Sequence, residues 1–152
     1  MKFLLLSVGK PKGALAEAIA YYETRAARYW PIEPVEVREE NARGHSADVV
    51  MTKEGERIAE RAGAARLIVC DVGGKTMTSE QLAAWLQRSR EEARDVAIVI
   101  GGAFGLAPAL RMRADLRLSL SALTLPHELA RLVLAEQLYR AGTIMRGEPY
   151  HK

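Results

Sequence analysis

Two short, almost uninterrupted apolar runs constrain the fold of this chain more than any other feature of its sequence. The runs are Leu67-Ile68-Val69-Cys70 and Val96-Ala97-Ile98-Val99-Ile100. A strand with one solvated face alternates apolar and polar residues, whereas a strand covered on both faces is apolar throughout. The runs therefore predict two buried strands, over residues 66–71 and 96–100, of a mostly parallel α/β sheet with helices on both faces.

The rest of the chain continues an alternation of strands and helices. We expect further strands at residues 2–8, 34–38 and 116–120. Helical spacing predicts helices from about Leu15 through Tyr29 to Pro31, at residues 47–62, from the Thr78 capping-box pattern, after Gly105, and at residues 126–141. No linker or repeat interrupts the 152 residues, so we expect a single α/β domain spanning residues 1–152.

Composition narrows the possible cellular settings and partners. The apolar start of the chain is too short for a signal peptide, and no stretch approaches the roughly 20 apolar residues of a membrane helix. The single cysteine, Cys70, excludes an internal disulfide and fits a reducing compartment, so we expect a cytoplasmic protein without membrane association. From Arg111 onward, seven Lys/Arg against four acids account for the whole net charge of +3. This excess suits either a polyanionic partner or a mildly basic surface.

Two loops after predicted strands are candidates for a ligand site. Ile100-Gly101-Gly102-Ala103-Phe104-Gly105-Leu106 places three glycines at a strand end, where open α/β sheets bind ligands and where glycine lets a ligand approach the backbone. By pattern, a tight turn explains it equally well. The segment from Ser119 to His127 offers backbone groups and hydroxyls in an apolar loop. By pattern alone, a strand end followed by a helix cap is the commoner explanation.

Gly74-Lys75-Thr76 resembles the end of a P-loop but lacks its first glycine. The required position, five residues before Gly74, is Val69, inside a predicted strand. We therefore exclude nucleoside triphosphate hydrolysis by a P-loop. We interpret the segment as a turn, either with a solvated lysine or beside a ligand pocket.

The histidines and the cysteine form no metal-ligand pattern, so we expect no metal site. His45 lies in a polar loop and His127 in the first turn of the last predicted helix, where solvation and a structural role are the ordinary explanations. Cys70 lies in a predicted buried strand, where a core role is a commoner explanation than a nucleophile. His151 lies in the terminal Tyr150-His151-Lys152, which is either a frayed tail or a group that stacks on a base and contacts phosphate.

Taken together, several segments resemble the ribosomal large subunit methyltransferase H family of the SPOUT superfamily. The resemblance includes Val8-Gly9-Lys10 and Lys53-Glu54-Gly55-Glu56 and extends over essentially the whole chain. The segments that carry it are residues 99–106, 118–127, 136–141 and 144–152. Some members end in Tyr-His-Arg and an acid, whereas this chain ends in Tyr-His-Lys; lysine keeps the charge but loses the bidentate fork. The middle of the family's glycine loop is also variable, and here it is Ala103-Phe104.

The resemblance implies a SPOUT fold with a C-terminal trefoil knot, which would lie within roughly residues 96–145, followed by a short tail at 146–152. It further implies a homodimer that binds S-adenosyl-L-methionine at the knot and methylates N3 of a pseudouridine in 23S ribosomal RNA on the assembled ribosome. By position, the residues implied in cofactor binding are Cys70, Asp71, Gly101, Gly102, Gly105, Leu120, Ser121, Ala122, Leu123, Thr124 and Leu125.

The same resemblance assigns the tail to RNA and to catalysis. Tyr150, His151, Lys152 and Arg146 would bind RNA, and His151, Tyr150 and Arg140 would act in the reaction across the dimer. His151 is the candidate general base for the N3 proton, because histidine exchanges protons near neutral pH. Tyr150 could stack on the base, and Arg140 or Lys152 could stabilise the developing anion.

Three other functions compete with this hypothesis. One is a SPOUT methyltransferase acting on tRNA, against which the tail motif argues. Another is a non-catalytic ribosome-associated binding protein with an unused cofactor pocket. The third, a Rossmann-like small-ligand domain, is disfavoured because no glycine fingerprint follows the first strand.

Overall fold

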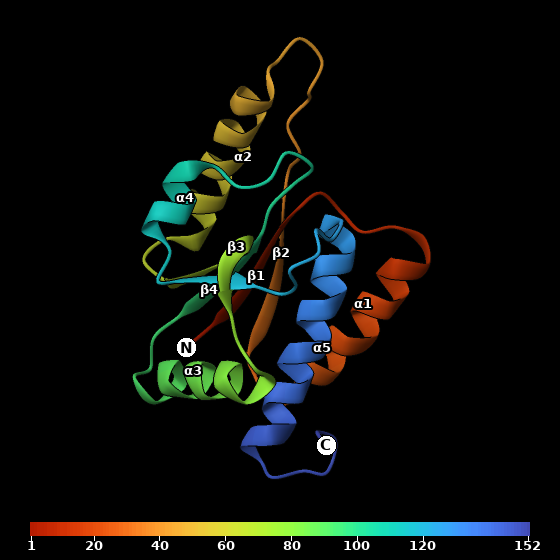
Figure 1. Ribbon diagram of the computed structural model, residues 1–152, viewed down its shortest axis with the longest axis vertical. Helices are drawn as coiled ribbons and strands as arrows, with labels where there is room; N and C mark the ends of the chain where they lie inside the picture. Colours follow the sequence, from red (N-terminus) through yellow and green to blue (C-terminus); the bar gives the residue numbers. More distant parts are fainter.

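The computed structural model, which describes residues 1–152, contains one five-stranded sheet in which all strands run parallel (Figure 1). The strand order is β2-β1-β4-β3-β5. The strands are β1 (Phe3–Val8), β2 (Ile32–Val37), β3 (Arg66–Thr76), β4 (Val96–Ile100) and β5 (Leu116–Ser119). The helices are α1 (Gly13–Ala26), α2 (Ala47–Ala62), α3 (Ser79–Glu91), α4 (Pro108–Arg113) and α5 (His127–Met145).

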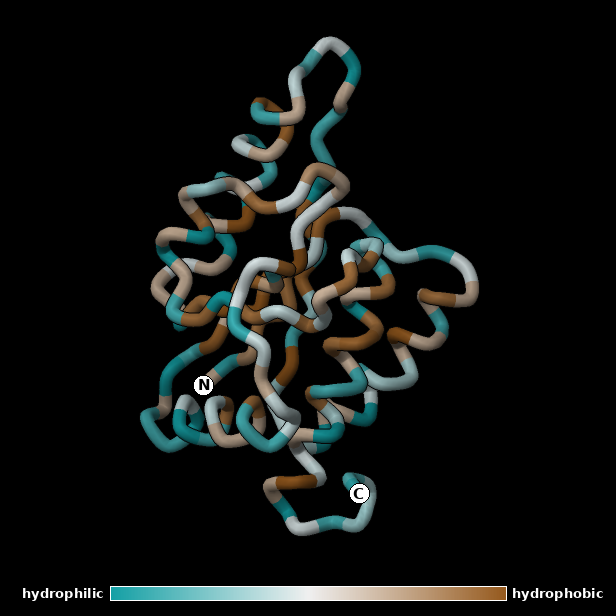
Figure 2. Tube along the Cα trace, viewed as in Figure 1, coloured by the Kyte–Doolittle hydropathy of each residue, from teal (hydrophilic) through white to brown (hydrophobic).

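Helices cover both faces of the sheet, which confirms the predicted α/β class. One face, toward Phe3, Ile68 and Ile98, packs against Trp30 and against α3 and α5. The other face, toward Leu6, Val69 and Val99, packs against α2 and α4. Successive residues of the central strands therefore enter two different cores, and a strand with a core on each side must be apolar throughout. Figure 2 shows the hydrophobic segments gathered between the layers, while hydrophilic residues follow the outer faces of the helices.

Two helices differ in length from the prediction. The first ends at Ala26, so that Tyr29 lies beyond it in a turn. The last continues to Met145 rather than ending near Ala141. In that final turn Gly142 and Thr143 are buried, and a Cβ on Gly142 would collide with the ring of Tyr29. Packing against Tyr29 therefore stabilises a helix end in which glycine would otherwise weaken helical structure.

The prediction of a turn at Gly74-Lys75-Thr76 is wrong, because β3 continues to Thr76. Both Cys70 and Lys75 pair with Leu118 of β5, so the residues between them form a bulge, after which pairing resumes. A Cβ on Gly74 would lie 2.5 Å from the carbonyl oxygen of Arg117, so only glycine lets the two strands come this close. The polar and glycine-rich composition of the bulge concealed the second half of the strand.

None of the helices is both long enough and apolar enough to span a membrane. The trefoil knot within residues 96–145 stays a prediction, as does the single-domain organisation.

Candidate functional site

A pocket of about 650 Å³ opens at the carboxyl ends of β4 and β5, beside the bulge in the middle of β3. Three segments form its wall: the bulge of β3, the glycine loop (residues 101–105) and the loop of residues 120–125 that leads into α5. These segments are distant in sequence and meet because the ends of parallel strands share one edge of the sheet. The pocket brings together ten of the eleven residues expected to bind a cofactor: Cys70, Asp71, Gly101, Gly102, Gly105, Leu120, Ser121, Leu123, Thr124 and Leu125. The eleventh, Ala122, is exposed and lies outside the wall.

The bulge of β3 places a carboxylate at the rim of the pocket. Asp71 Oδ2 accepts hydrogen bonds from Arg117 Nε at 3.1 Å and Nη2 at 2.7 Å, and Oδ1 accepts one from the Gly73 amide at 3.1 Å. The bonds from Arg117 hold the pKa of Asp71 below its usual range. Because both of its carboxylate oxygens are hydrogen-bonded, Asp71 holds the bulge in place. Bulges beside functional sites commonly change the direction of a side chain.

Cys70 contributes apolar wall rather than chemistry. Burial raises the pKa of its thiol to about 12, so the residue stays a thiol at neutral pH. Since the thiolate is the nucleophilic form, Cys70 is excluded as a nucleophile here.

The glycine loop keeps its backbone close to the pocket because it folds tightly on itself. The amide of Gly105 donates to the carbonyl of Gly102 at 3.0 Å, and Gly105 has a φ of 85°, where glycine is strongly favoured. A Cβ on Gly101 would lie 3.0 Å from the carbonyl carbon of Gly105 and from the side chain of Leu106. A side chain at Gly101 would therefore open the loop, and one at Gly105 would strain the backbone.

The loop of residues 120–125 supplies polar backbone groups that have few partners within the chain. Ser119 Oγ donates to the Ser121 carbonyl at 3.0 Å, and the Leu123 amide donates to Ser121 Oγ at 2.9 Å. No backbone-to-backbone hydrogen bond outside the helices and strands involves residues 120–125. Most amide and carbonyl groups of this loop are thus available to the edge of a ligand.

The composition of the pocket fits a nucleoside-containing cofactor. Nine of its 18 lining residues are hydrophobic, and its volume lies within the range of roughly 300–1,000 Å³ usual for small-ligand sites. Apolar walls suit a purine ring, and free backbone groups suit the polar edge of that ring. S-adenosylmethionine contains a purine ring with such a polar edge, so the residues of this pocket can hold it.

Eight further residues complete the wall. Five of them lie inside the two loops that the sequence offered as candidate ligand sites, Val72 directly follows Asp71, and Ala130 lies in the first turn of α5. Arg111 of α4 carried no signal, because only the fold brings this helix to the pocket, where Arg111 Nη2 donates to the Leu106 carbonyl at 3.2 Å. The eight further residues are Val72, Ile100, Ala103, Leu106, Arg111, Pro126, His127 and Ala130.

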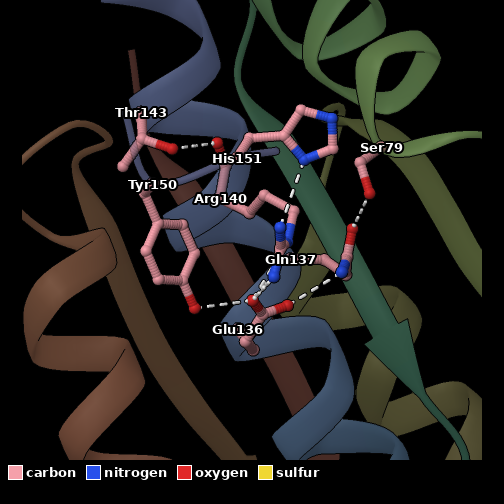
Figure 3. Close-up of polar contacts among 7 residues, drawn as sticks. All are labelled: Ser79, Glu136, Gln137, Arg140, Thr143, Tyr150 and His151. Carbon is pink, nitrogen blue, oxygen red and sulfur yellow. Dashed lines mark hydrogen bonds and ion pairs between the residues drawn. The ribbon is translucent and has the colours of Figure 1, made fainter. Parts of the chain in front are cut away.

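The C-terminal tail folds back onto the far end of α5, where it forms what we call the tail cluster: Glu80, Glu136, Arg140, Tyr150 and His151. Arg140 Nη2 and the Tyr150 hydroxyl both donate to Glu136 Oε1, at 2.6 and 2.8 Å (Figure 3). The guanidinium of Arg140 also lies 4.8 Å from the centre of the Tyr150 ring. The tail is therefore anchored by charged and aromatic contacts rather than frayed.

Both ring nitrogens of His151 have partners within the cluster. Nδ1 lies 3.1 Å from Arg140 Nη1, and Nε2 lies 2.8 Å from Glu80 Oε1. Because a guanidinium can only donate, Nδ1 must accept, and the proton of a neutral imidazole then resides on Nε2 and points to Glu80. In this arrangement neither nitrogen is free to take a proton from a substrate.

The tail cluster is separate from the pocket in the same chain. Ala130 lines the pocket and Arg140 belongs to the cluster, and ten residues of helix correspond to about 15 Å. No tail residue lines the pocket. Arg146 and Lys152 are exposed, and Arg146 lies with its guanidinium 4.7 Å from the centre of the Tyr29 ring. The residues expected to bind RNA and those expected to bind cofactor thus form two groups.

The structure revises the basic excess read from the sequence. Arg131, one of its seven basic residues, is only 5% exposed; its Nε lies 2.7 Å from Glu23 Oε1, and its Nη1 donates to Ser7 Oγ at 3.0 Å. Arg117 and Arg140 are paired with Asp71 and Glu136. Less positive charge faces solvent at this end than the composition indicates. No group of three or more His, Cys, Asp or Glu side chains is arranged to hold a metal ion.

Comparisons with known proteins agree with this geometry. A family model described as predicted SPOUT methyltransferase matches residues 1–151. The chain is 60% identical to a protein of Gemmatimonas aurantiaca named ribosomal RNA large subunit methyltransferase H, with all of both chains covered. It is 44% identical to a protein of the same name from Syntrophotalea carbinolica, with 99% of each covered. Among solved structures, a probable methyltransferase from Bordetella pertussis Tohama I has a TM-score of 0.56 at 17% identity, covering 91% of this chain and 95% of that one, and shows the fold alone.

Proposed function

This chain belongs to the SPOUT methyltransferase family and is an S-adenosylmethionine-dependent methyltransferase, and we propose that its acceptor is N3 of a pseudouridine in large-subunit ribosomal RNA. The observation that carries the proposal is the 60% identity, over the whole of both chains, to a protein named for methylation of that RNA. The ribosome is the proposed substrate, so we expect the protein in the cytoplasm.

The pocket holds the cofactor in this proposal. The backbone groups of residues 120–125 would bind the polar edge of the adenine, the apolar residues Leu120, Leu123 and Leu125 would contact its ring, and the glycine loop would bind the rest of the cofactor. Bound there, S-adenosylmethionine supplies an electrophilic methyl group. The enzyme's own task is to place the acceptor in line with that group and to exclude water.

A second copy of the chain completes the site. The tail residues Tyr150 and His151 lie at the opposite end of α5 from the pocket, which supports delivery of the tail from a partner protomer. Exposed apolar side chains near the pocket, Val72, Phe104, Met112 and Leu123, offer a surface that a partner can cover. A homodimer is therefore part of the proposal.

Methylation at N3 replaces an N–H proton, so a residue must accept that proton. In this proposal RNA binding displaces Arg140 from His151 Nδ1, and the freed nitrogen becomes the base. Arg140 then faces the anion that develops on the pyrimidine, and Tyr150 stacks on the ring. Lys152 and Arg146 contact the RNA backbone, where their charge strengthens binding at low salt.

Methyl transfer from labelled S-adenosylmethionine tests the substrate. The protein is incubated with ribosomes from a strain that lacks the modification, with free ribosomal RNA, and with bulk tRNA. We expect label in large-subunit RNA, with N3-methylpseudouridine identified by mass spectrometry of its nucleosides. Label in tRNA would overturn the proposed acceptor but not the enzyme class. Cofactor binding without label in any acceptor would favour a non-catalytic ribosome-binding role.

A further inference from the structure

Glu54 of α2 is a buried carboxyl group that the proposed reaction does not use. Its residue is only 3% exposed. One of its oxygens, Oε2, accepts a hydrogen bond from the Glu40 amide at 3.0 Å, in the loop after β2. The other, Oε1, is buried and has no hydrogen-bond partner. Buried polar atoms are nearly always paired, so an unpaired one requires an explanation.

The unpaired oxygen faces the glycine loop. A Cβ built on Gly102 would lie 2.8 Å from Glu54 Oε1 and 3.2 Å from Val8 Cγ1, so Gly102 packs directly on this carboxyl and on the end of β1. Gly102 also lines the pocket. Glu54 therefore lies immediately behind the pocket wall. It contacts both the loop after β2, through the Glu40 amide, and the loop after β4, through Gly102.

We propose that Glu54 is a positioning residue of the cofactor pocket, and that its Oε1 hydroxyl donates a hydrogen bond to a backbone carbonyl of the glycine loop when the cofactor is bound. The inference rests on the proposed function, because it takes the pocket to be the cofactor site. Glu54 touches neither cofactor nor RNA and acts through the position of Gly101 and Gly102.

The surroundings of Glu54 favour the protonated carboxyl that this bond needs. Burial raises the pKa of Glu54 above its ordinary value, and the carboxylates of Glu39 and Glu40 raise it further. The Glu40 amide and the guanidinium of Arg57 act in the opposite direction and are smaller than the effect of burial. Gly102, which packs on Oε1, and Val8, which packs on Gly102, carry no charge.

The proposal predicts the direction of a pH dependence. As pH rises through the raised pKa of Glu54, the carboxyl loses its donor and cofactor affinity falls. Glutamine carries a donor at every pH and has nearly the same shape, so Glu54→Gln should bind cofactor with an affinity that does not change with pH. Glu54→Ala lacks both contacts and should bind about tenfold more weakly at low pH, the effect expected for one lost hydrogen bond in a buried site.

Calorimetric titration with S-adenosylmethionine and with S-adenosylhomocysteine between pH 5.5 and 8.5 tests this, with folding of each variant verified by circular dichroism. The matched control is Glu56→Gln, an exposed carboxyl in the same turn of α2, which should follow the wild type. Hydrogen exchange of residues 101–106 gives a second readout: cofactor should protect these amides in the wild type and in Glu54→Gln, and less in Glu54→Ala.

The pH profiles of the wild type and of the Glu54 variants test the positioning role. A flat profile for Glu54→Gln against a falling one for the wild type supports the positioning role. A Glu54→Gln profile that matches the wild type, or equal loop protection in all variants, would overturn it while leaving the proposed function intact. If the wild type itself binds no cofactor, the proposed function fails, and this inference with it. Should Glu54→Ala fail to fold, the glutamine variant still decides.

Discussion

The two ends of α5 hold two regions built in different ways. At its start lies the pocket, whose polar groups are mainly backbone amides and carbonyls held by glycines and by a bulge of β3. At its end lies the tail cluster, where four charged or titratable side chains and a tyrosine satisfy one another. The pocket is already open to a ligand, whereas neither ring nitrogen of His151 in the cluster is free until one of its contacts is exchanged.

Because of this difference, the two regions should respond differently to substitutions and to pH. A backbone-built site depends on local conformation, so it should be sensitive at glycines and tolerant of many side-chain changes. A site built from side chains should fail when one partner is removed, and its state should depend on pH. Substitutions in the two regions should therefore separate binding at the pocket from chemistry at the tail.

The largest expected effect on cofactor binding comes from Gly101→Val, in the pocket. A Cβ there already lies 3.0 Å from the carbonyl carbon of Gly105, and valine adds two methyl groups, so the loop must open. Overpacking of this kind costs about 1–3 kcal/mol, which corresponds to a loss of cofactor affinity of roughly tenfold to a hundredfold by calorimetry. Gly73→Val is the control: it adds the same atoms at the rim, where the nearest atom to its Cβ is 3.7 Å away. Equal losses in both variants would contradict a backbone-built pocket.

Arg140→Ala should show the opposite pattern at the tail. Without its guanidinium, Glu136, Tyr150 and His151 lose their common partner, and misplacement of a catalytic group can slow a reaction about a hundredfold. We expect single-turnover methyl transfer to fall by about that factor, while cofactor affinity changes less than about twofold. Arg88→Ala, at an exposed arginine of α3, serves as the control. A loss of cofactor binding in Arg140→Ala would show that the two regions are not independent.

Tyr150→Phe should have a smaller effect, on stability and its pH dependence. Partial burial and the hydrogen bond to Glu136 raise the pKa of Tyr150 to about 12, above the ordinary value of 10. Because the folded pKa is raised, the contribution of the phenol is fully present below pH 10 and is lost as pH rises toward 12. Denaturant unfolding should therefore show the variant less stable by about 1 kcal/mol at pH 8, with the difference shrinking above pH 10. Tyr21→Phe, at an exposed tyrosine, should not change stability. A difference that stays constant from pH 8 to 11 would contradict this explanation.

The smallest effect is expected from Glu80→Gln. The hydrogen bond from His151 lowers the pKa of Glu80, so the attraction between them is present above the ordinary carboxyl value of 4.5 and lost as pH falls through the lowered one. In nuclear magnetic resonance spectra, the His151 ring signals of the wild type should show a step in this acid range. Glu80→Gln should lack that step, and Glu91→Gln, at an exposed carboxyl at the other end of α3, should retain it. A step that persists in Glu80→Gln would mean that another acid contacts the ring.

Much of the fold could be predicted because local pattern and burial agree along the chain. The apolar runs at residues 67–70 and 96–100 form central strands, and the Thr78 capping box begins α3 as expected. Where the local pattern and the tertiary packing disagree, the prediction was wrong. Lys75 and Thr76 resemble a turn, yet pairing with β5 makes them part of a strand, and Gly142 lies inside a helix because Tyr29 packs on it.

The candidate site also contains residues that the sequence predicted and residues that only the fold reveals. The resemblance and the glycine pattern selected ten residues that the fold assembles into one pocket. Neither the resemblance nor the pattern gave a reason to include Arg111, which lines the pocket only because the fold places α4 beside it. Nor did they indicate Glu54 as a group behind the wall, because a Lys-Glu-Gly-Glu stretch in a helix resembles a solvated face.

By itself the sequence determined the class of sheet, the positions of its buried strands and the family. Those properties depend on residue type and spacing along one segment, which a linear pattern records. The tertiary structure alone decided which side chains are paired. It joined the tail residues to Glu136 and Glu80, buried Arg131 against Glu23, and left one oxygen of Glu54 without a partner behind Gly102. Such contacts join residues far apart in the chain, and their energies depend on distance and burial, which exist only once the chain has folded.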